Sequence, residues 1–438
     1  MTPQIKQRIE QIRRGEVPEG YKRTKVGIVP EEWKIKRLAQ VLRKQTCKNT
    51  DNAIHNVLTN SATRGIVDQK DYFDKQIANS ENTDNYYIVE NGYFVYNPRI
   101  SVSAPCGPFN KYYGCEKGIM SPLYTVYKYI DCSTDYTEYL SYFFSSANWH
   151  RYMNSIANYG ARNDRMNVTS DTMSAMPLPY PPLPEQKKIA EILQTQDKLI
   201  ELQQKKIEEL KKLKKAYLSK MFPKKGCNAP EIRFPGFTNP WEQRKLSSLC
   251  DKFTDGDWIE AKDQSNSGVR LIQTGNVGIA EYIDKTNNKK WVSNSTFETL
   301  HCEEVFEGDI LISRLPEPAG RACIVPNLGT KMITAVDCTI VRVSDNTSNE
   351  FLLQYLSSQK YFDEVNTCLA GGTRQRISRS NLANFDVPIP TKKREQEAIG
   401  SFFANLDHLI TLHQRKLEEM KIYKKSLMQL LLTGIVRM

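Results

Sequence analysis

The sequence lacks long apolar runs, paired cysteines and clustered histidines. No stretch of 18 consecutive apolar residues occurs among its 438 residues, so we expect no membrane-spanning helix. Residues 1–21 carry charges throughout, and we expect no secretory signal there. The ten cysteines form no C-x-x-C pair, and the five histidines are dispersed. We therefore expect a cytoplasmic protein with mostly buried free thiols, no disulfides and no metal site.

Motifs for phosphate binding, base modification and DNA cleavage are also missing. No G-x-x-x-x-G-K-[ST] loop occurs. The tripeptide Asn97-Pro98-Arg99 lacks the second proline and the aromatic residue of an adenine methyltransferase motif. Residues 260–262 read E-A-K, but no Pro-Asp precedes them as in a nuclease E-x-K. We expect no catalytic residue and no cofactor in this chain, with an unfamiliar active site as the open alternative.

What is present is the composition of a basic, globular, multidomain protein. Apolar residues make up 39% and charged residues 25% of a chain long enough for two or three domains. The 61 Lys and Arg exceed the 50 Asp and Glu, which gives a net charge of +11. Such a charge indicates a polyanionic partner, although a basic protein that binds no polyanion fits it equally well.

The chain contains an internal repeat built around two predicted long helices. Residues 182–222 and 390–432 align without gaps, at an offset of 210, when Glu185 and Gln186 are laid on Glu395 and Gln396. In both copies the apolar residues follow a heptad seam. The predicted seam residues are Ile189, Leu193, Ile200, Ile207, Leu210, Phe403, Ile410, Leu417, Met420 and Leu427.

Two units that each end in such a helix favour pairing of the helices within the chain. We expect an antiparallel coiled coil with pseudo-two-fold symmetry; packing of each helix on its own domain, or between chains, is the alternative. A helix of about 37 residues spans roughly 55 Å and would hold two domains apart. The lysine-rich end at 205–225, with nine Lys against two Glu, suits solvent, a partner protein or DNA.

The segments before the two helices share landmarks rather than sequence. Residues 86–89, 93–96 and 124–127 predict strands, and residues 136–157 predict one helix. The pair Trp33 and Leu38 recurs as Trp241 and Leu246, residues 90–95 recur as 307–312, and the loop 159–165 recurs as 370–376. We therefore expect an α+β protein with two mixed α/β domains. The predicted boundaries are an N-terminal amphipathic helix at 1–20, a first domain at 21–182, a first long helix at 183–222, a linker at 223–235, a second domain at 236–390 and a second long helix at 391–432.

These landmarks resemble the specificity subunits of bacterial type I restriction-modification enzymes, over nearly the whole chain. The resemblance rests on residues 27–33 (GIVPEEW), on residues 233–237 (RFPGF) with Trp241, and on the proline-rich boundaries before Glu185 and Glu395. It implies two target recognition domains, each reading half of a bipartite sequence in double-stranded DNA. It also implies that the paired helices set the spacing and dock two methyltransferase subunits.

The same resemblance implies that catalysis resides in the partners. Methyltransferase subunits would use S-adenosylmethionine to methylate adenine, and restriction/translocase subunits bound through them would use ATP and magnesium. This chain would supply specificity without catalysis. A different possibility is an autonomous two-domain DNA-binding regulator that recognises its site without partners.

Candidate DNA-contacting residues are polar or basic and lie in predicted loops. Arginine can bind guanine through two hydrogen bonds, Asn and Gln can bind adenine, and basic side chains contact phosphates. The candidates are Arg64, Arg99, Arg162, Asn163 and Arg165 in the first domain, and Thr274, Asn276, Arg314, Arg374, Gln375, Arg376 and Arg379 in the second. Each could instead be a surface or ion-paired residue, and the two arginine loops could instead fix the loop to the long helix.

Overall fold

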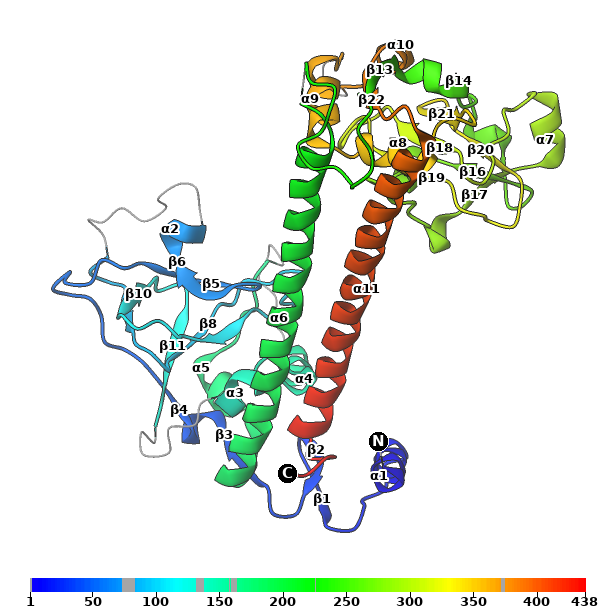
Figure 1. The fold of residues 1–438 in the computed structure, drawn as a ribbon. Helices are drawn as coiled ribbons and strands as arrows, with labels where there is room; N and C mark the ends of the chain where they lie inside the picture. Colours follow the sequence, from blue (N-terminus) through cyan, green and yellow to red (C-terminus); the bar gives the residue numbers. More distant parts are fainter. Residues whose placement is uncertain are drawn as a thin grey trace. The chain divides into compact units, whose positions relative to one another are not determined.

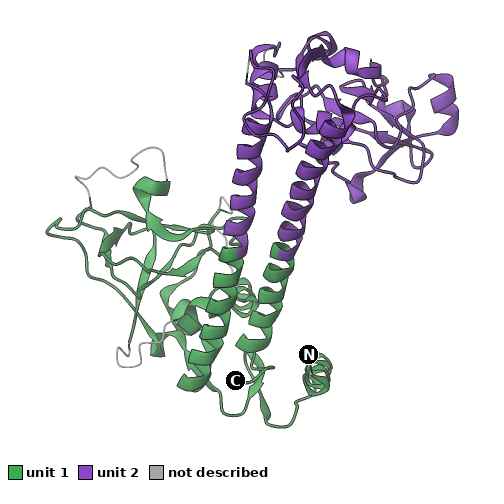
Figure 2. Cartoon of the chain, viewed as in Figure 1, with its two compact units in different colours: residues 1–202, 417–438 green, residues 203–416 purple. Residues whose placement is uncertain are grey.

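The computed structural model describes residues 2–72, 83–130, 138–156, 158, 164–224, 226–371 and 375–438. The chain divides into two compact units (Figure 2). Unit 1 comprises residues 1–202 and 417–438, and unit 2 comprises residues 203–416. Each unit therefore combines one globular domain with a part of both long helices.

Each half of the chain closes with a long helix (Figure 1), and the strands and short helices directly before that helix follow the same order in both halves. The elements up to the first long helix are α1 (Pro3–Arg13), β1 (Tyr21–Thr24), β2 (Gly27–Pro30), β3 (Lys34–Arg37), η1 (Leu38–Gln40), β4 (Leu42–Lys44), β5 (Leu58–Ser61), β6 (Gly65–Asp68), α2 (Gln69–Tyr72), β7 (Tyr87–Val89), β8 (Phe94–Tyr96), β9 (Phe109–Lys111), β10 (Gly118–Met120), β11 (Thr125–Tyr129), α3 (Glu138–Phe143), α4 (Ala147–Ser155), α5 (Ser170–Ser174), β12 (Pro177–Tyr180) and α6 (Leu183–Met221). The remaining elements are β13 (Glu242–Lys245), η3 (Leu246–Leu249), β14 (Cys250–Asp255), η4 (Ala261–Asp263), β15 (Gln264–Ser265), β16 (Val269–Ile272), η5 (Thr274–Asn276), η6 (Thr286–Asn288), β17 (Lys290–Val292), α7 (Asn294–Thr299), β18 (Ile310–Ser313), β19 (Ala322–Ile324), β20 (Met332–Thr334), β21 (Cys338–Val343), α8 (Asn349–Tyr355), α9 (Gln359–Thr367), α10 (Arg379–Ala383), β22 (Asp386–Ile389) and α11 (Lys393–Leu432).

Unit 1 is organised around an antiparallel sheet with strand order β4-β11-β8-β9. The predicted strands at 86–89, 93–96 and 124–127 are confirmed as β7, β8 and β11. One face of this sheet is aromatic, and the rings of Phe109 and Phe144 stack with their centroids 4.1 Å apart. Ile189 and Leu193 of α6 and Leu431 of α11 belong to the same buried cluster, so both long helices complete the core of this unit.

Unit 2 repeats this arrangement with the strand order β14-β21-β18-β19. Its core includes Trp241, Phe351 and Tyr355, together with Ile399 and Phe403 of α11. A second sheet, β15-β17-β16-β20, contains the parallel pair β16 and β20. Unit 1 has two-stranded sheets at the corresponding place, β5-β6 and β10-β7.

Residues 136–157, predicted as one helix, form two helices wherever they are described, and this prediction is wrong. Helix α3 ends at Phe143, and the hydroxyl of Ser146 caps α4 by accepting a hydrogen bond from the Trp149 backbone N–H at 3.4 Å. In unit 2 Ser358 caps α9 in the same way, through the N–H of Tyr361 at 3.3 Å. Serine competes for backbone donors and therefore starts helices better than it continues them.

One repeat landmark is displaced by a single residue. Gly92 and Gly308 occupy equivalent turns in the two units, with φ of +85° and +89°. Residues 90–95 therefore correspond to 306–311 rather than to 307–312. Equivalent backbone hydrogen bonds close the two turns. The Tyr93 N–H donates to the Glu90 carbonyl at 3.0 Å, and the Asp309 N–H donates to the Phe306 carbonyl at 3.1 Å. Glycine is required because a side chain at positive φ is strained.

Cysteine burial is less complete than expected. All nine described cysteines are free, but only Cys106, Cys302, Cys323 and Cys338 are buried, while Cys47, Cys115 and Cys227 are exposed. Within the described ranges, His, Cys, Asp and Glu side chains nowhere gather in threes to hold a metal ion. None of the described helices is both long and apolar enough to cross a membrane.

Candidate nucleic-acid interface and its supporting helices

A buried glutamate fixes the domain of unit 2 to the start of α11. The Glu395 carboxylate is 2% exposed and accepts hydrogen bonds from the guanidinium of Arg233 at 2.7 and 2.8 Å and from the Trp241 indole at 3.2 Å. Arg233 comes from the segment that follows α6. Its hydrogen bond to Glu395 raises the pKa of Arg233.

Unit 1 has the same contact at the start of α6. The Glu185 carboxylate is 4% exposed and accepts from the Trp33 indole at 2.9 Å and from Arg437 at 2.7 and 3.1 Å. Arg437 comes from the segment that follows α11 and also donates to Glu32 at 2.7 Å. Hydrogen bonding to Glu185 raises the pKa of Arg437. Both domains are thus fixed to a helix start by a fully compensated buried charge.

The long helices pair antiparallel within each unit. In unit 1 Lys424 of α11 forms an ion pair with Asp197 of α6. In unit 2 Lys214 of α6 forms an ion pair with Asp407 of α11 at 2.6 Å. The offset of 210 converts one pair into the other, so the repeat keeps both partners.

Burial along the helices follows the heptad seam. Ile189, Leu193, Ile207, Leu210, Phe403, Ile410 and Leu417 are buried, and Ile200, Met420 and Leu427 are half-buried. Four leucines off the seam are exposed and repeat at the same offset: Leu199 and Leu202 in unit 1, Leu409 and Leu412 in unit 2. These exposed leucine pairs form one apolar patch per unit, and the sequence repeat could have revealed them.

In unit 1 two predicted arginines are brought together at the end of β8. Arg99 and Arg165 form an antiparallel bridge, with the Met166 N–H donating to the Pro98 carbonyl at 2.9 Å. Both arginine side chains are exposed. Residues 101–104 form a tight hairpin beside them, closed by backbone bonds in both directions between Ser101 and Ala104.

In unit 2 the equivalent loop meets the end of β18. The Ile377 N–H donates to the Arg314 carbonyl at 3.2 Å, as Met166 does to Pro98 in unit 1. The Arg314 side chain is 7% exposed and lies 3.4 Å from the carboxylate of Asp255. Arg379 lies 3.9 Å from the same carboxylate and remains 45% exposed.

A second carboxylate, Asp337, holds Arg376 at 3.7 Å, with the Arg376 side chain 58% exposed. The structure therefore gathers three of the predicted arginines, Arg314, Arg376 and Arg379, around Asp255 and Asp337. The guanidinium groups of Arg376 and Arg379 are exposed to solvent, whereas that of Arg314 is buried in its ion pair with Asp255. Neither carboxylate could be anticipated from the sequence, because the two are far apart along the chain.

The remaining candidates are placed more diversely. Arg64 is exposed in the turn after β5, with its guanidinium 5.7 Å from the Tyr72 ring centroid, and Gln375 is exposed. Thr274 is half-buried. Asn276 is buried and uses its side chain within its own turn, accepting from Gln273 at 3.0 Å and donating to Ile283 at 2.8 Å. Arg162, Asn163 and Arg374 lie outside the described residues.

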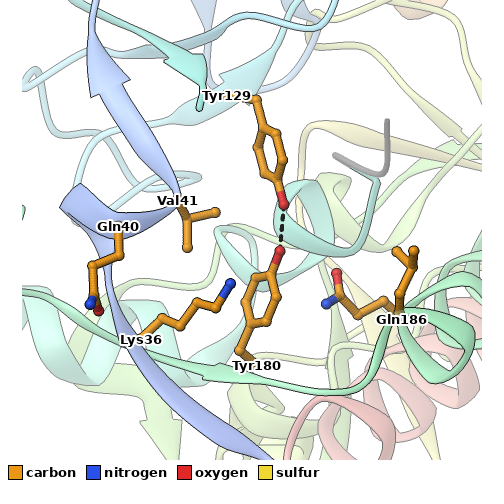
Figure 3. Close-up of a pocket in the computed structure, with 7 residues that line it drawn as sticks. Lys36, Gln40, Val41, Tyr129, Tyr180 and Gln186 are labelled. Atoms are coloured by element: carbon orange, nitrogen blue, oxygen red, sulfur yellow. Dashed lines mark hydrogen bonds between the residues drawn. The ribbon is translucent and has the colours of Figure 1, made fainter. Parts of the chain in front are cut away.

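A small cavity lies beside the start of α6 (Figure 3). It measures about 140 Å³. The hydroxyls of Tyr129 and Tyr180 point at each other and are hydrogen-bonded, and the Lys36 ammonium lies 4.0 Å from the Tyr180 ring centroid.

Comparison with known proteins points in one direction. The family model of the type I restriction modification DNA specificity domain matches twice, at residues 30–212 and 238–421. The chain is 28% identical over 277 residues to the type I restriction enzyme MjaVIII specificity subunit of Methanocaldococcus jannaschii. The aligned region covers 59% of this chain and 62% of that protein. It is 26% identical over 436 residues to the putative type I restriction enzyme MjaX specificity subunit of the same organism, covering 96% and 97% of the two chains.

Solved structures share the fold at low sequence identity. A chain from work on complex assembly and conformational transition of the type I R-M system matches with a TM-score of 0.59 and 16% identity, covering 93% of this chain and 99% of that one. The S subunit of a type I restriction-modification system from M. genitalium matches with a TM-score of 0.51 and 14% identity, covering 91% and 96%.

Proposed function

The chain belongs to the type I restriction-modification DNA specificity family and carries two recognition domains, and from this premise we propose that each domain reads one half of a bipartite sequence in double-stranded DNA. The observation that carries the proposal is the arginine loop, which is bridged to the end of β8 in unit 1 and to the end of β18 in unit 2. The exposed arginines Arg99, Arg165, Arg376 and Arg379 supply phosphate contacts and guanine recognition.

The long helices dock the catalytic partners and set the spacing between the half-sites. The exposed leucine pairs give each unit the same apolar patch, which fits two copies of one partner, the methyltransferase subunit. Restriction/translocase subunits join through those partners. S-adenosylmethionine, ATP and magnesium act in the partners, and this chain contributes no catalytic residue. At 39 and 40 residues, α6 and α11 are each about 60 Å long, which suits a spacer.

Exchange of one domain tests independent reading. Residues 40–175 are replaced by those of another family member, and the hybrid is produced with its methyltransferase partner. Mapping of methylated adenines in the host genome should show that one half of the recognised sequence changes and the other half stays. A change in both halves contradicts the proposal, and the reciprocal exchange of residues 250–385 is the matched control.

Partner stoichiometry tests the docking surfaces. Native mass spectrometry of the wild-type complex should show two methyltransferase subunits per chain. The double variant Leu199→Asp with Leu202→Asp should retain one, and adding Leu409→Asp with Leu412→Asp should remove both. Site-specific DNA binding that is unaffected by adding the partner would instead favour the autonomous regulator.

A further inference from the structure

We propose that Trp258 in unit 2 is a further specificity-determining residue, whose indole contacts the bases of the half-site that this unit reads. The inference rests on the proposed function of the chain. Sequence patterns do not single out this side chain, since one tryptophan outside the repeat landmarks does not distinguish a surface contact from a core residue.

The exposure of Trp258 sets it apart from the other tryptophans. Its side chain is 72% exposed, whereas Trp33, Trp149 and Trp241 are exposed by 3% or less. Trp291, the fifth, is half-buried, and the Arg270 guanidinium lies 5.6 Å from its ring. Indole is the largest apolar side chain, so leaving it in water is unfavourable unless a partner covers it.

The backbone on both sides of Trp258 is held firmly. The Asp257 N–H donates to the Thr334 carbonyl at 2.9 Å, and the Asp257 carbonyl accepts from Val336 at 2.9 Å. The Asp257 carboxylate accepts from the Glu303 N–H at 2.9 Å. On the other side, Ile259 packs against the apolar cluster of β16 and β17. The indole is thus presented from a fixed segment, which lowers the entropy lost on binding.

The same segment leads directly to the exposed arginines. Trp258 follows β14, which ends at Asp255, the residue that holds Arg379. Ala335, which forms a bridge with Asp257, leads through a turn to Asp337, the residue that holds Arg376. Trp258 therefore shares an edge of unit 2 with two arginines that face solvent, and this combination favours DNA over an apolar protein partner.

The contact is made by the apolar faces of the indole. The indole N–H is occupied, since it donates to the Glu260 carboxylate at 3.2 Å. An exposed ring beside phosphate-binding arginines can read a thymine methyl group or insert between neighbouring base pairs. Both modes give sequence preference at one or two positions of a single half-site.

Selection from a pool of random-sequence DNA duplexes tests the proposal with the full-length chain assembled with its methyltransferase subunits. The wild type should enrich a bipartite sequence. Trp258→Ala should enrich the unit 1 half unchanged and lose preference at one or two positions of the other half. Its affinity for the wild-type site should fall roughly tenfold to a hundredfold, because that is the range for losing one aromatic contact with a base. Trp258→Phe should keep most of the preference.

The control is Phe306→Ala, because Phe306 is another exposed aromatic residue of unit 2 and lies before β18, at the opposite end of that strand from Arg314. This variant should select the wild-type sequence. Replacing thymines by deoxyuridine, or adenines by 2-aminopurine, in the affected half should identify a methyl contact or an insertion, and the absence of both signals overturns a base contact.

Unchanged selection and affinity for Trp258→Ala overturn the proposal. Equal loss in both halves, or a loss confined to methyltransferase binding, overturns it as well and assigns Trp258 to folding or to a protein contact. If the wild type enriches no sequence, the proposed function of the chain fails together with this inference.

Discussion

The two glutamate anchors differ in the origin of their arginine. Glu395 at the start of α11 is bound by Arg233, from the segment after α6, and Glu185 at the start of α6 is bound by Arg437, from the segment after α11. Each long helix is therefore followed by the arginine that fixes the start of the other. The two repeats follow one another in the sequence, but their anchoring contacts are reciprocal, because each repeat supplies the arginine that binds the glutamate of the other.

The anchors also differ in their surroundings. The Arg233 side chain is 15% exposed, whereas Arg437 is 34% exposed and shares its charge with Glu32. Solvent screening weakens an ion pair, and a second carboxylate replaces part of a lost interaction. The anchor of unit 2 should thus contribute more to stability than the anchor of unit 1.

The largest effect should come from deleting residues 433–438. This deletion removes Arg437, the hydrogen bond from Tyr21 to the Gly434 carbonyl at 2.7 Å and the bond from Arg8 to the Ile435 carbonyl at 2.6 Å. We expect the free energy of unfolding of unit 1 to fall by about 4 kcal/mol. Hydrogen exchange with mass spectrometry should show faster exchange in β8 and unchanged exchange in β18. Equal acceleration in both strands would show that the anchor is not specific to unit 1.

The next largest effect should be Glu395→Gln, which leaves the Arg233 charge buried without its partner. The expected loss is about 3 kcal/mol for unit 2. The matched variant Glu185→Gln should cost about 1 kcal/mol in unit 1, since Arg437 keeps Glu32 and is screened by solvent. Proteolysis during a urea titration, read by mass spectrometry, reports the two units separately. The reverse order of the two losses would refute the comparison of the anchors.

Replacing the tryptophan donors should have a smaller effect. Trp33→Phe and Trp241→Phe keep an aromatic ring but remove the indole N–H that binds Glu185 or Glu395. We expect each to cost about 2 kcal/mol in its own unit, as for hydrogen bonds to charged groups. Thermal unfolding followed by hydrogen exchange gives the value, and Trp291→Phe controls for ring volume. A loss no larger than that control would mean that the hydrogen bond adds nothing.

The smallest effects concern the ion pairs between the helices. Asp407 binds Lys214, which is 13% exposed, and also accepts from Gln354, so Asp407→Asn should cost about 1 kcal/mol. Asp197 is 46% exposed in its pair with Lys424, so Asp197→Asn should cost about 0.5 kcal/mol. Thermal unfolding at low and high salt measures both losses. The exchanged pair Asp407→Lys with Lys214→Asp should recover most of the stability, and failure to recover it would assign the loss to packing.

Much of the fold could be predicted because it depends on regular spacing. The heptad seam and the offset of 210 identify both long helices, and the aromatic runs identify β7, β8 and β11. The break before α4 was missed because Ser146 lies inside a pattern that otherwise continues as a helix. Its capping role depends on a backbone turn that the side-chain pattern does not encode.

The candidate site could be predicted only in part. The arginine loops were found because both halves contain them, yet Arg314 and Asn276 turned out to be buried. Whether a polar side chain faces a ligand or satisfies its own fold depends on distant partners, such as Asp255. The role of Arg437 in binding Glu185 could not be predicted from the repeat either. Arg233 and Arg437 lie at different distances from the helices that precede them, so no single offset aligns the two.

The reciprocal placement of Arg233 and Arg437 has a consequence for the ancestry of the chain. In each unit the anchor joins a glutamate from one repeat to an arginine that follows the helix of the other repeat. A polypeptide with a single repeat would satisfy its glutamate only by associating with a second copy of itself, as a symmetric homodimer. Gene duplication and fusion of such a dimer would preserve both anchors while releasing the two recognition domains to diverge separately.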